Sequence, residues 1–496
     1  MSEMLRPILG QLLRHPRRTA VIDDRRRWPG IDLLGGAFHV ARALDRAGAS
    51  KHVAVMLPTS GAFPMAMLGT WLSGRTLVPI NYLLSADERQ RLIDHSDANV
   101  LLTAGIMLDY LGDAPSGVKV LKLDEMRFGG VPPLRWPPRP AADDVAAILY
   151  TSGTSGAAKG VMLTHGNLRS NVEATVELAK LDRSDGFLGV LPQFHSFGLT
   201  ALTLIPIRVG VPVIYTARFV PAKLVKLIRD HRPDIFMAIP SMYHALLGVK
   251  RAGREDFESI RLAVSGAEPL PESVREGFRQ RFGVTILEGY GLTETGPIVS
   301  WSLPERHMPG AVGTVLPGID VRIVDGGNRP LQTGEHGEII VRGPSVMAGY
   351  YKAPDLTERV FDSDGFFHTG DRGKLDEEGR LWVTGRIKEM MIIAGENVFP
   401  NEIEEVIAAH PSVHSAGVVG RVDPSRGEVP VAFVQLAEGE TFDEPALRQW
   451  CRDRLAGFKV PRQIQPVDEL PRSATGKILR RKLSEMSGPD GNSADP

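Results

Sequence analysis

A run of glycines, hydroxyl side chains and one lysine in the first half of the chain could bind a phosphate group. It occupies residues 150–160 and reads Tyr-Thr-Ser-Gly-Thr-Ser-Gly-Ala-Ala-Lys-Gly. Glycines let backbone N–H groups approach an anion, hydroxyls donate hydrogen bonds, and Lys159 adds a positive charge. The spacing differs from that of the Walker P-loop because no Gly-Lys-Ser/Thr closes it. Taken alone, such a run is more often a mobile loop.

The segments that must position this run predict an α/β fold. The apolar residues 145–149 directly before it are typical of a buried strand. Apolar runs alternate with helical patterns over most of the chain, which is typical of sheets with helices on their faces. Strands are predicted at residues 53–57, 76–79, 100–103, 186–191, 212–215, 235–239 and 262–265, and helices at 62–73, 222–230 and 272–282.

The last part of the chain predicts two further units. After about residue 310, short strands such as 321–324 and 337–342 with glycine-rich turns indicate a small β subdomain that closes the large one. From Lys388 onward, the pattern indicates a compact α+β lid. Its expected elements are helices at 401–410 and 445–455 and strands at 413–419, 429–436 and 464–467. We therefore expect an N-terminal domain at 1–387, a lid at 388–486 and a disordered tail at 487–496, which is rich in Gly, Pro, Ser and Asp.

Four further motifs follow the phosphate-loop candidate. They are residues 288–295 (Glu-Gly-Tyr-Gly-Leu-Thr-Glu-Thr), 366–371 (Phe-Phe-His-Thr-Gly-Asp), 384–388 (Thr-Gly-Arg-Ile-Lys) and 471–477 (Pro-Arg-Ser-Ala-Thr-Gly-Lys). In this order, the set resembles the core motifs of the adenylate-forming superfamily, which contains acyl-CoA synthetases, luciferases and peptide-synthetase adenylation domains. The resemblance spans residues 29–483. Ser155 and Ala158 depart from the usual Thr and Pro, but Ser keeps the hydroxyl and losing Pro only loosens the loop.

The resemblance implies a reaction in two halves with ATP, Mg²⁺ and coenzyme A. A carboxylate attacks the α-phosphorus of ATP and expels pyrophosphate, which leaves an acyl-adenylate. A thiol then attacks the acyl carbon and expels AMP. Both halves depend mainly on positioning and on stabilising charge.

The resemblance also assigns residues to the nucleotide. The residues expected to bind the β- and γ-phosphates are Thr151, Ser152, Gly153, Thr154, Ser155, Gly156 and Lys159. The adenine pocket is expected to contain Gly266, Ala267, Glu268 and Tyr290. Asp371 is expected to accept from both ribose hydroxyls, since a carboxylate accepts two donors well, and Arg386 to reach the ribose or a phosphate.

The catalytic assignments concern the α-phosphate and the acid. Thr293 resembles the threonine that holds the α-phosphate, and Glu294 the glutamate that binds Mg²⁺, a cation that prefers oxygen ligands. Lys477 is expected to lie between the attacking carboxylate and the α-phosphate, where its charge cancels their repulsion. Without the motif, a lysine here would be read as a solvated surface residue.

The hinge and the thiol tunnel are assigned in the same way. Lys388 stands at the hinge about which the mobile lid is expected to rotate between the two half-reactions. Gly395 would then line the tunnel for the thiol, where a side chain would block it. A plain turn glycine is the alternative interpretation of Gly395.

His195 and its neighbours point to the acid. Residues 192–198 (Pro-Gln-Phe-His-Ser-Phe-Gly) resemble a family segment that lies beside the acid, so we interpret His195 as a pocket gate. The apolar residues 199–207 and 239–246 could form the wall of a long tunnel, and no charged side chain for an amino acid is evident there. This favours a medium- or long-chain fatty acid. An aryl acid is the alternative substrate, and a catalytically inactive nucleotide-binding regulator is the alternative from another class of protein.

The C-terminal part of the sequence indicates which thiol accepts the acyl group. Residues 422–428 and 458–462 look like the acyl-CoA-synthetase version of this domain, which favours coenzyme A. Residues 62–94 resemble acyl-carrier-protein synthetase domains, so an acyl carrier protein is the second candidate acceptor.

Composition limits the remaining possibilities. The 496 residues carry 58 Lys and Arg against 59 Asp and Glu, so nothing in the overall charge favours nucleic acid or an anionic membrane. The single cysteine, Cys451, excludes an internal disulfide, and we interpret it as a packed residue. The N-terminus lacks a signal-peptide pattern, and the apolar stretch 199–215 is too interrupted to span a bilayer. We expect a cytoplasmic monomer or homodimer with at most peripheral membrane contact.

Overall fold

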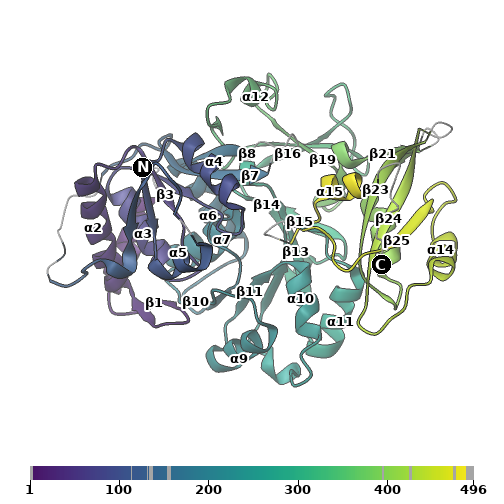
Figure 1. The fold of residues 1–496 in the computed structure, drawn as a ribbon. Coiled ribbons are helices and arrows are strands. Elements are labelled where there is room, and N and C mark those ends of the chain that lie inside the picture. The colour runs from purple at the N-terminus through teal and green to yellow at the C-terminus, as the bar shows by residue number, and fades with distance from the viewer. Residues whose placement is uncertain are drawn as a thin grey trace.

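The computed structural model describes residues 4–112, 114–130, 132, 138–152, 158–393, 396–423, 427–472 and 476–487. Two large sheets and their helices make up the body of the molecule. A smaller sheet, formed by the C-terminal part of the chain, lies beside this body (Figure 1). The predicted α/β class is confirmed. The predicted disorder of the tail falls outside the described residues, apart from Ser487.

The first sheet has seven strands and carries the phosphate-loop candidate at one end. Its order is β18 (Gly349–Tyr350), β8 (Ala158–Thr164), β7 (Val145–Ser152), β4 (Thr76–Pro79), β3 (His52–Val55), β5 (Val100–Thr103) and β6 (Lys119–Lys122). The helices along this part of the chain are α2 (Gly30–Ala47), α3 (Ala62–Leu72), α4 (Ala86–Ser96), α5 (Gly105–Leu111) and α6 (His165–Leu178). All residues of α3 except Ala62 are buried, which places this helix inside the body.

The second sheet joins a parallel half to an antiparallel half. The parallel half contains β1 (Thr19–Ile22), β10 (Val213–Tyr215), β9 (Phe187–Gly189), β11 (Ile235–Ala238), β12 (Leu262–Ser265) and β13 (Ile286–Gly291), with β2 (Arg27–Pro29) antiparallel at its edge. The antiparallel half contains β14 (Ile298–Trp301), β15 (Ala311–Val315), β20 (Arg380–Arg386), β19 (Phe367–Leu375), β17 (Gly337–Arg342) and β16 (Asp320–Val324). The strands expected to form a separate β subdomain thus continue the large sheet, because β13 pairs with β12 on one side and β14 on the other.

The described residues of the body contain seven further α-helices. They are α1 (Leu5–Arg14), α7 (Ser196–Leu199), α8 (Ile205–Val209), α9 (Pro221–His231), α10 (Pro240–Leu247), α11 (Glu272–Phe282) and α12 (Pro354–Glu358). A π-helical turn, Thr200–Leu204, links α7 to α8. In the described residues, no helix is long and apolar enough to cross a membrane, which agrees with the interrupted pattern of residues 199–215.

The C-terminal sheet has its own core. Its order is β22 (Glu396–Val398), β21 (Met391–Ile393), β24 (Gly427–Leu436) and β23 (Val413–Asp423), and β25 (Gln463–Pro466) also pairs with β24. The helices of this unit are α13 (Pro400–Ala408), α14 (Glu444–Arg452) and α15 (Arg480–Met486). Cys451 is fully buried in this core, and burial raises the pKa of its thiol to about 11. The expected boundary at Lys388 precedes the first strand of this sheet and stays a prediction.

Helix α4 (Ala86–Ser96) has a well-defined residue at each end. It begins at a capping box, in which the Ser85 hydroxyl accepts from the Glu88 N–H and the Glu88 carboxylate accepts from the Ser85 N–H. It ends at Asp97, whose φ of 56° lies in the left-handed region that normally favours glycine. Ser85 therefore marks the start of α4 through its side chain, and Asp97 marks its end through its backbone.

Candidate active site

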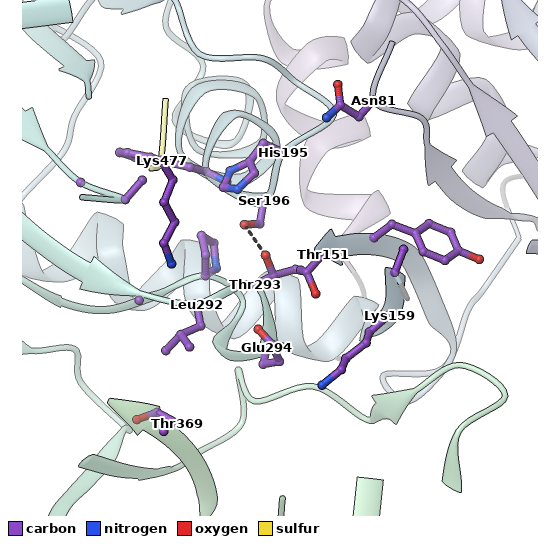
Figure 2. Close-up of a pocket in the computed structure, with 18 of the residues that line it drawn as sticks. Asn81, Thr151, Lys159, His195, Ser196, Leu292, Thr293, Glu294, Thr369 and Lys477 are labelled. Carbon is purple, nitrogen blue, oxygen red and sulfur yellow. Dashed lines mark hydrogen bonds between the residues drawn. The ribbon is translucent and has the colours of Figure 1, made fainter. Parts of the chain in front are cut away.

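An open cavity of about 1570 Å³ contains most of the expected nucleotide residues. It is lined from the body of the molecule by the two large sheets and from the C-terminal unit by the segment around Lys477. Figure 2 shows Thr151, Lys159, His195, Thr293, Glu294 and Lys477 around one shared space. The segments that carry them are far apart in sequence, so the fold brings them together.

The described residues of the phosphate-loop candidate lie at the paired ends of β7 and β8. Thr151 pairs with Lys159 across the hairpin, and both residues line the cavity. The Lys159 ammonium lies 5.3 Å from the centre of the Tyr350 ring, which fits a cation–π contact. Gly153, Thr154, Ser155 and Gly156 lie outside the described residues, as does the side chain of Ser152, and their binding role stays a prediction.

Thr293 and Glu294 lie on a short 3-10 turn, Thr293–Thr295, directly after β13. The Thr293 and Ser196 hydroxyl oxygens are 3.0 Å apart, and this hydrogen bond is drawn in Figure 2. The Tyr350 hydroxyl donates to Glu294 Oε1 over 2.9 Å. Glu294 therefore keeps its second carboxylate oxygen for another partner at the edge of the cavity.

Asp371 lies beneath the cavity with a well-defined set of partners. The Tyr290 hydroxyl donates to Asp371 Oδ2 over 2.7 Å, and the Arg386 Nε lies 2.9 Å from Oδ1. Burial raises the pKa of Asp371, while Arg386 and Tyr290 oppose that rise. Asp371 is not part of the cavity lining and both of its carboxylate oxygens already have a partner, so its contact with a ribose stays a prediction.

The segment Gly266, Ala267 and Glu268 follows β12 and is split between two environments. Gly266 and Ala267 line the cavity, and Ala267 has a φ of 72°, which is unusual for a residue with a Cβ. Glu268 lies deeper. Its Oε1 is buried without a hydrogen-bond partner, and burial raises its pKa. The predicted adenine role is thus compatible with the positions of Gly266, Ala267 and Tyr290, whereas Glu268 is not part of the cavity lining.

Lys477 belongs to the C-terminal unit and lines the cavity. Two hydrogen bonds join residues close to it in the chain. Arg472 Nη1 donates to the Gly476 carbonyl over 2.8 Å, and the Leu479 N–H donates to the Pro471 carbonyl over 2.7 Å. Desolvation lowers the pKa of Lys477, Arg386 adds to this effect, and Glu389 and Asp371 oppose it. The ammonium group thus lies among the charges of the nucleotide site, as the motif predicts.

Two other predicted residues concern the motion of the lid. Lys388 lies in a 3-10 turn, Ile387–Glu389, between β20 and β21, and it lines the cavity. Gly395 lies outside the described residues. Their roles in rotation and in thiol access stay predictions.

A second cavity of about 1000 Å³ adjoins the first at His195, Phe197 and Ala267. Its lining is mainly apolar and includes Trp28, Met65, Tyr82, Phe219, Ile239 and Met242. Charged residues also line it, namely Asp23, Asp24, Arg25, Arg26, Asp124 and Arg218. Residues 239–246 therefore contribute to it as predicted. The prediction for residues 199–207 is wrong, because Leu199 to Leu204 and Ile205 to Ile207 pack into the buried core instead.

His195 stands where the two cavities meet. Its Nδ1 accepts from the Phe197 N–H over 3.3 Å at the start of α7. Burial lowers its pKa to about 4, so the ring is neutral at pH 7 and carries its proton on Nε2. Gly198 makes this turn possible, since a Cβ there would lie 2.0 Å from the Pro192 carbonyl oxygen. The geometry agrees with a gate between nucleotide and acid.

Two sequence patterns of one known enzyme family match the chain. The pattern described as "AMP-binding enzyme" matches residues 10–351, and that described as "AMP-binding enzyme C-terminal domain" matches residues 402–477. The chain belongs to the AMP-binding enzyme family.

Individual members of this family resemble the chain over nearly its whole length. A long-chain-fatty-acid–CoA ligase of Bacillus subtilis (strain 168) is 33% identical over 95% of this chain and 92% of its own. A feruloyl-CoA synthase of an Amycolatopsis species is 32% identical over 95% of this chain and 96% of its own. The crystal structure of ATP-bound MatB from Rhodopseudomonas palustris superposes with a TM-score of 0.90 at 30% identity, covering 98% of this chain and 99% of that one.

Some residues of this AMP-binding enzyme's site were missed by the sequence reasoning. Ser196 bonds to Thr293, and Tyr350 contacts both Glu294 and Lys159. Ser196 lies inside the quoted segment 192–198, so its position next to His195 was a usable signal. Tyr350 carried no such signal, because its place in the site depends on the pairing of β18 with β8.

Proposed function

We propose that this member of the AMP-binding family is an AMP-forming acid–CoA ligase. It would join a carboxylic acid to AMP with release of pyrophosphate, and then transfer the acyl group to the thiol of coenzyme A with release of AMP. The observation that carries the proposal is the single cavity shared by Lys159, Thr293 and Lys477, which adjoins a separate apolar cavity at His195. Phosphate and acid would thus meet at that junction.

The residues would act by position and charge. Thr151 and Lys159 would hold the β- and γ-phosphates, and Thr293, oriented by Ser196, would donate to the α-phosphate. Lys477 would offset the repulsion between the acid's carboxylate and the α-phosphate and would stabilise the negative charge that grows as the new bond forms. Arg386 and Asp371 would fix the ribose.

Magnesium fits the donors of this site. Within the described residues, no cluster of three or more acidic, histidine or cysteine side chains could hold a metal alone. Glu294 instead offers one carboxylate beside the phosphate-binding residues, which suits Mg²⁺, a cation that usually combines one or two carboxylates with phosphate oxygens and water. When bound, Mg²⁺ would neutralise charge on the phosphates. Glu294 would hold it, and Tyr350 would orient that carboxylate.

For the acid, we propose a medium- or long-chain fatty acid. The second cavity supports this choice through its volume of about 1000 Å³ and its mainly apolar lining. An extended acyl chain could run from His195 along Ile239 and Met242.

An aryl acid is a second candidate, favoured by a specific pair of rings. Tyr82 and Phe194 meet edge to face with centroids 5.1 Å apart near His195, and such a pair can hold a planar ring. Relatives of the chain act on acids of both kinds, according to their names. An acyl carrier protein remains the alternative acceptor.

The test is pyrophosphate release by the purified protein with Mg²⁺, ATP and a panel of fatty, aryl and amino acids, with and without coenzyme A. We expect fatty acids to support turnover and coenzyme A to accelerate it. Turnover with aryl acids alone would overturn the choice of acid and leave the ligase proposal standing. If no acid releases pyrophosphate, the protein is not a ligase, and an inactive nucleotide-binding regulator becomes the better reading.

A further inference from the structure

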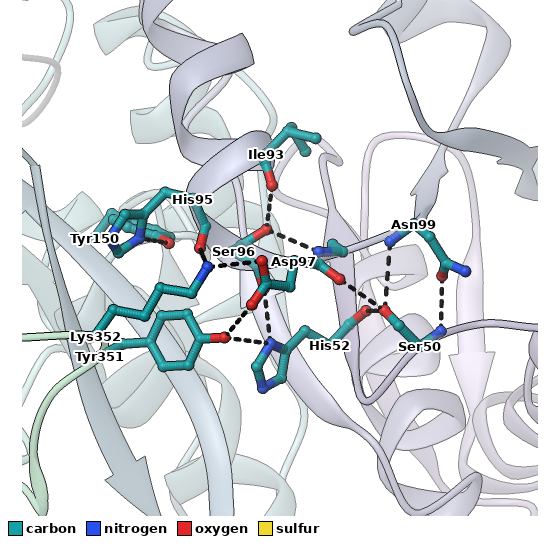
Figure 3. Close-up of polar contacts among 11 residues, drawn as sticks. Ser50, His52, Ile93, His95, Ser96, Asp97, Asn99, Tyr150, Tyr351 and Lys352 are labelled. Atoms are coloured by element: carbon teal, nitrogen blue, oxygen red, sulfur yellow. Dashed lines mark hydrogen bonds and ion pairs between the residues drawn. The ribbon is translucent and has the colours of Figure 1, made fainter.

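A polar cluster at the rim of the cavity, whose lining includes His95 and Tyr150, lies beside β7 and β8 (Figure 3). β4 pairs with β7 at Ala147, several residues before β7 ends at Ser152. Beyond that point the hairpin is flanked by β18 and the residues that follow it. The Tyr351 N–H donates to the Gly160 carbonyl over 2.7 Å. Contacts that hold Tyr351 in place therefore also hold Gly160, near the start of β8.

The residues after β18 are held in turn by the end of α4. The Tyr351 hydroxyl donates to Asp97 Oδ2 over 2.7 Å, and the Lys352 ammonium lies 2.7 Å from Asp97 Oδ1. Lys352 also donates to the His95 carbonyl over 3.0 Å. Figure 3 shows these contacts converging on Asp97.

A second contact reaches the hairpin itself. The Tyr150 hydroxyl lies 2.8 Å from His95 Nδ1, and Tyr150 directly precedes Thr151 in β7. His95 therefore touches one strand of the hairpin through its ring and the flanking segment through its carbonyl. We call the five residues His95, Asp97, Tyr150, Tyr351 and Lys352 the hairpin clamp.

Two clamp residues have a left-handed backbone. Asp97 has a φ of 56° and Lys352 a φ of 55°, values at which glycine fits without steric cost. The two side chains are 55% and 43% exposed, so their ion pair contributes little to global stability. Their contacts instead join the end of α4 to the segment beside the hairpin.

We propose that the hairpin clamp positions the phosphate-binding hairpin for the β- and γ-phosphates of ATP, with Asp97 and Lys352 as positioning residues. The inference rests on the ligase activity proposed above. The clamp residues do not touch the α-phosphate site at Thr293. Loss of the clamp should therefore weaken the binding of ATP and pyrophosphate, which carry those phosphates, and spare AMP, which lacks them.

The test variants use the left-handed backbone. Asp97→Gly and Lys352→Gly each remove a side chain at a position where glycine fits, so we expect both proteins to fold with nearly the parent melting temperature. Lys180→Gly is the matched control, because Lys180 has a φ of 49° and is an exposed residue away from the clamp. Tyr150→Phe removes only the hydroxyl that meets His95, and Asp97→Asn keeps an acceptor for Tyr351.

The measurements are KM for ATP in the forward direction, KM for pyrophosphate in the reverse direction from acyl-adenylate, and the Kd for AMP. For Asp97→Gly and Lys352→Gly we expect the two KM values to rise about fivefold, as for the loss of one or two partly exposed polar contacts, with the Kd for AMP within about twofold of the parent. Tyr150→Phe should act in the same direction, Asp97→Asn should recover part of the effect, and Lys180→Gly should behave as the parent.

Two outcomes would overturn the proposal. The first is an unchanged KM for ATP and pyrophosphate in both glycine variants. The second is an equal weakening of ATP, pyrophosphate and AMP together with a lower melting temperature, which would indicate a general structural role. If the parent protein itself neither releases nor incorporates pyrophosphate, the proposed ligase function has failed instead, and the two failures are thus distinguishable.

Discussion

At the scale of single residues, Lys477 shows how context changes the chemistry of an ordinary side chain. It is a lysine near the C-terminus, but its loop places it in the cavity of Thr293 and Glu294. The surrounding protein and Arg386 lower its pKa, whereas Glu389 and Asp371 favour the charged form. Bound phosphates would favour the charged form further, because opposite charges stabilise one another.

The first prediction concerns this charge. Lys477→Ala should slow acyl-adenylate formation by about 10²–10³, the usual cost of losing one contact that stabilises transition-state charge. Thioester formation from supplied acyl-adenylate should stay near the parent rate, because the rotation proposed for the lid would move Lys477 away from the α-phosphate before that step. Single-turnover kinetics of each half-reaction measure this. Equal losses in the two half-reactions would contradict a role confined to the first.

The second prediction concerns pH and the buried histidines. Burial lowers the pKa of both His165 and His195 from 6.5 to about 4 in the folded protein. Below pH 6.5 the unfolded chain binds protons that these rings do not, so the free energy of unfolding should fall as the pH decreases from 6.5 to 4. The slope is at most about 1.4 kcal/mol per pH unit for each ring. Chemical denaturation across this range measures it, and His165→Phe should reduce the slope. A slope that the variant leaves unchanged would show that His165 does not contribute.

At the scale of elements, helix α15 fixes the loop that carries Lys477. Arg480 is the first residue of α15. Its Nε lies 2.8 Å from Oε2 of Glu389, which lies in the turn Ile387–Glu389. Arg480 also contacts Glu404 on α13 over 3.1 Å. In Figure 1, α15 lies between β23 and the body of the molecule. Helix α15 is thus connected both to the turn Ile387–Glu389 and to α13.

The third prediction tests this connection. Arg480→Ala leaves two partly buried carboxylates without their cation, which typically costs about 3–5 kcal/mol for a buried pair and somewhat less where water can enter. We expect a lower melting temperature and slower adenylation, with little change in the KM for ATP. The matched control is Arg481→Ala, since Arg481 pairs with Glu485 on the exposed face of the same helix. Equal effects of the two substitutions would argue against a specific role of Arg480.

At the scale of the whole molecule, the site is shared between the body and the lid. Thr151, Thr293 and Arg386 come from the body, whereas Lys477 comes from the segment after the lid sheet. Between them, the only direct covalent connection runs through the turn Ile387–Glu389. We propose that this turn is the hinge about which the lid moves after adenylation.

The fourth prediction restricts the hinge. Lys388→Pro fixes φ at about −65°, which a 3-10 turn tolerates and a rotated hinge need not. Adenylation should therefore proceed near the parent rate, while thioester formation should fall sharply. Lys388→Ala is the control, since it removes the same side chain and leaves φ free. If Lys388→Pro forms thioester as fast as Lys388→Ala, the rotation about this turn does not occur.

Much of the fold was predictable from local sequence. The expected strands 76–79, 100–103, 262–265 and 337–342 and the helix 272–282 have the same bounds in the structure. These segments have strong periodicity and clear turn residues at their ends, so local interactions suffice to define them. The residues expected at the nucleotide also lie largely in one cavity, because short motifs keep their residue types at fixed spacing.

The motifs and local patterns of the sequence were enough to indicate the family, the order of strands and helices, and the residue types of the first cavity. Which apolar segments line the second cavity followed from the packing of the folded chain. Residues 199–207 are as apolar as 239–246, yet the former fill the core and the latter line the cavity. The hairpin clamp was hidden for the same reason: Asp97 and Lys352 are 255 residues apart and meet only through strand pairing. Hydrophobic pattern shows that a side chain will be buried, but which neighbour it meets depends on how distant elements pack.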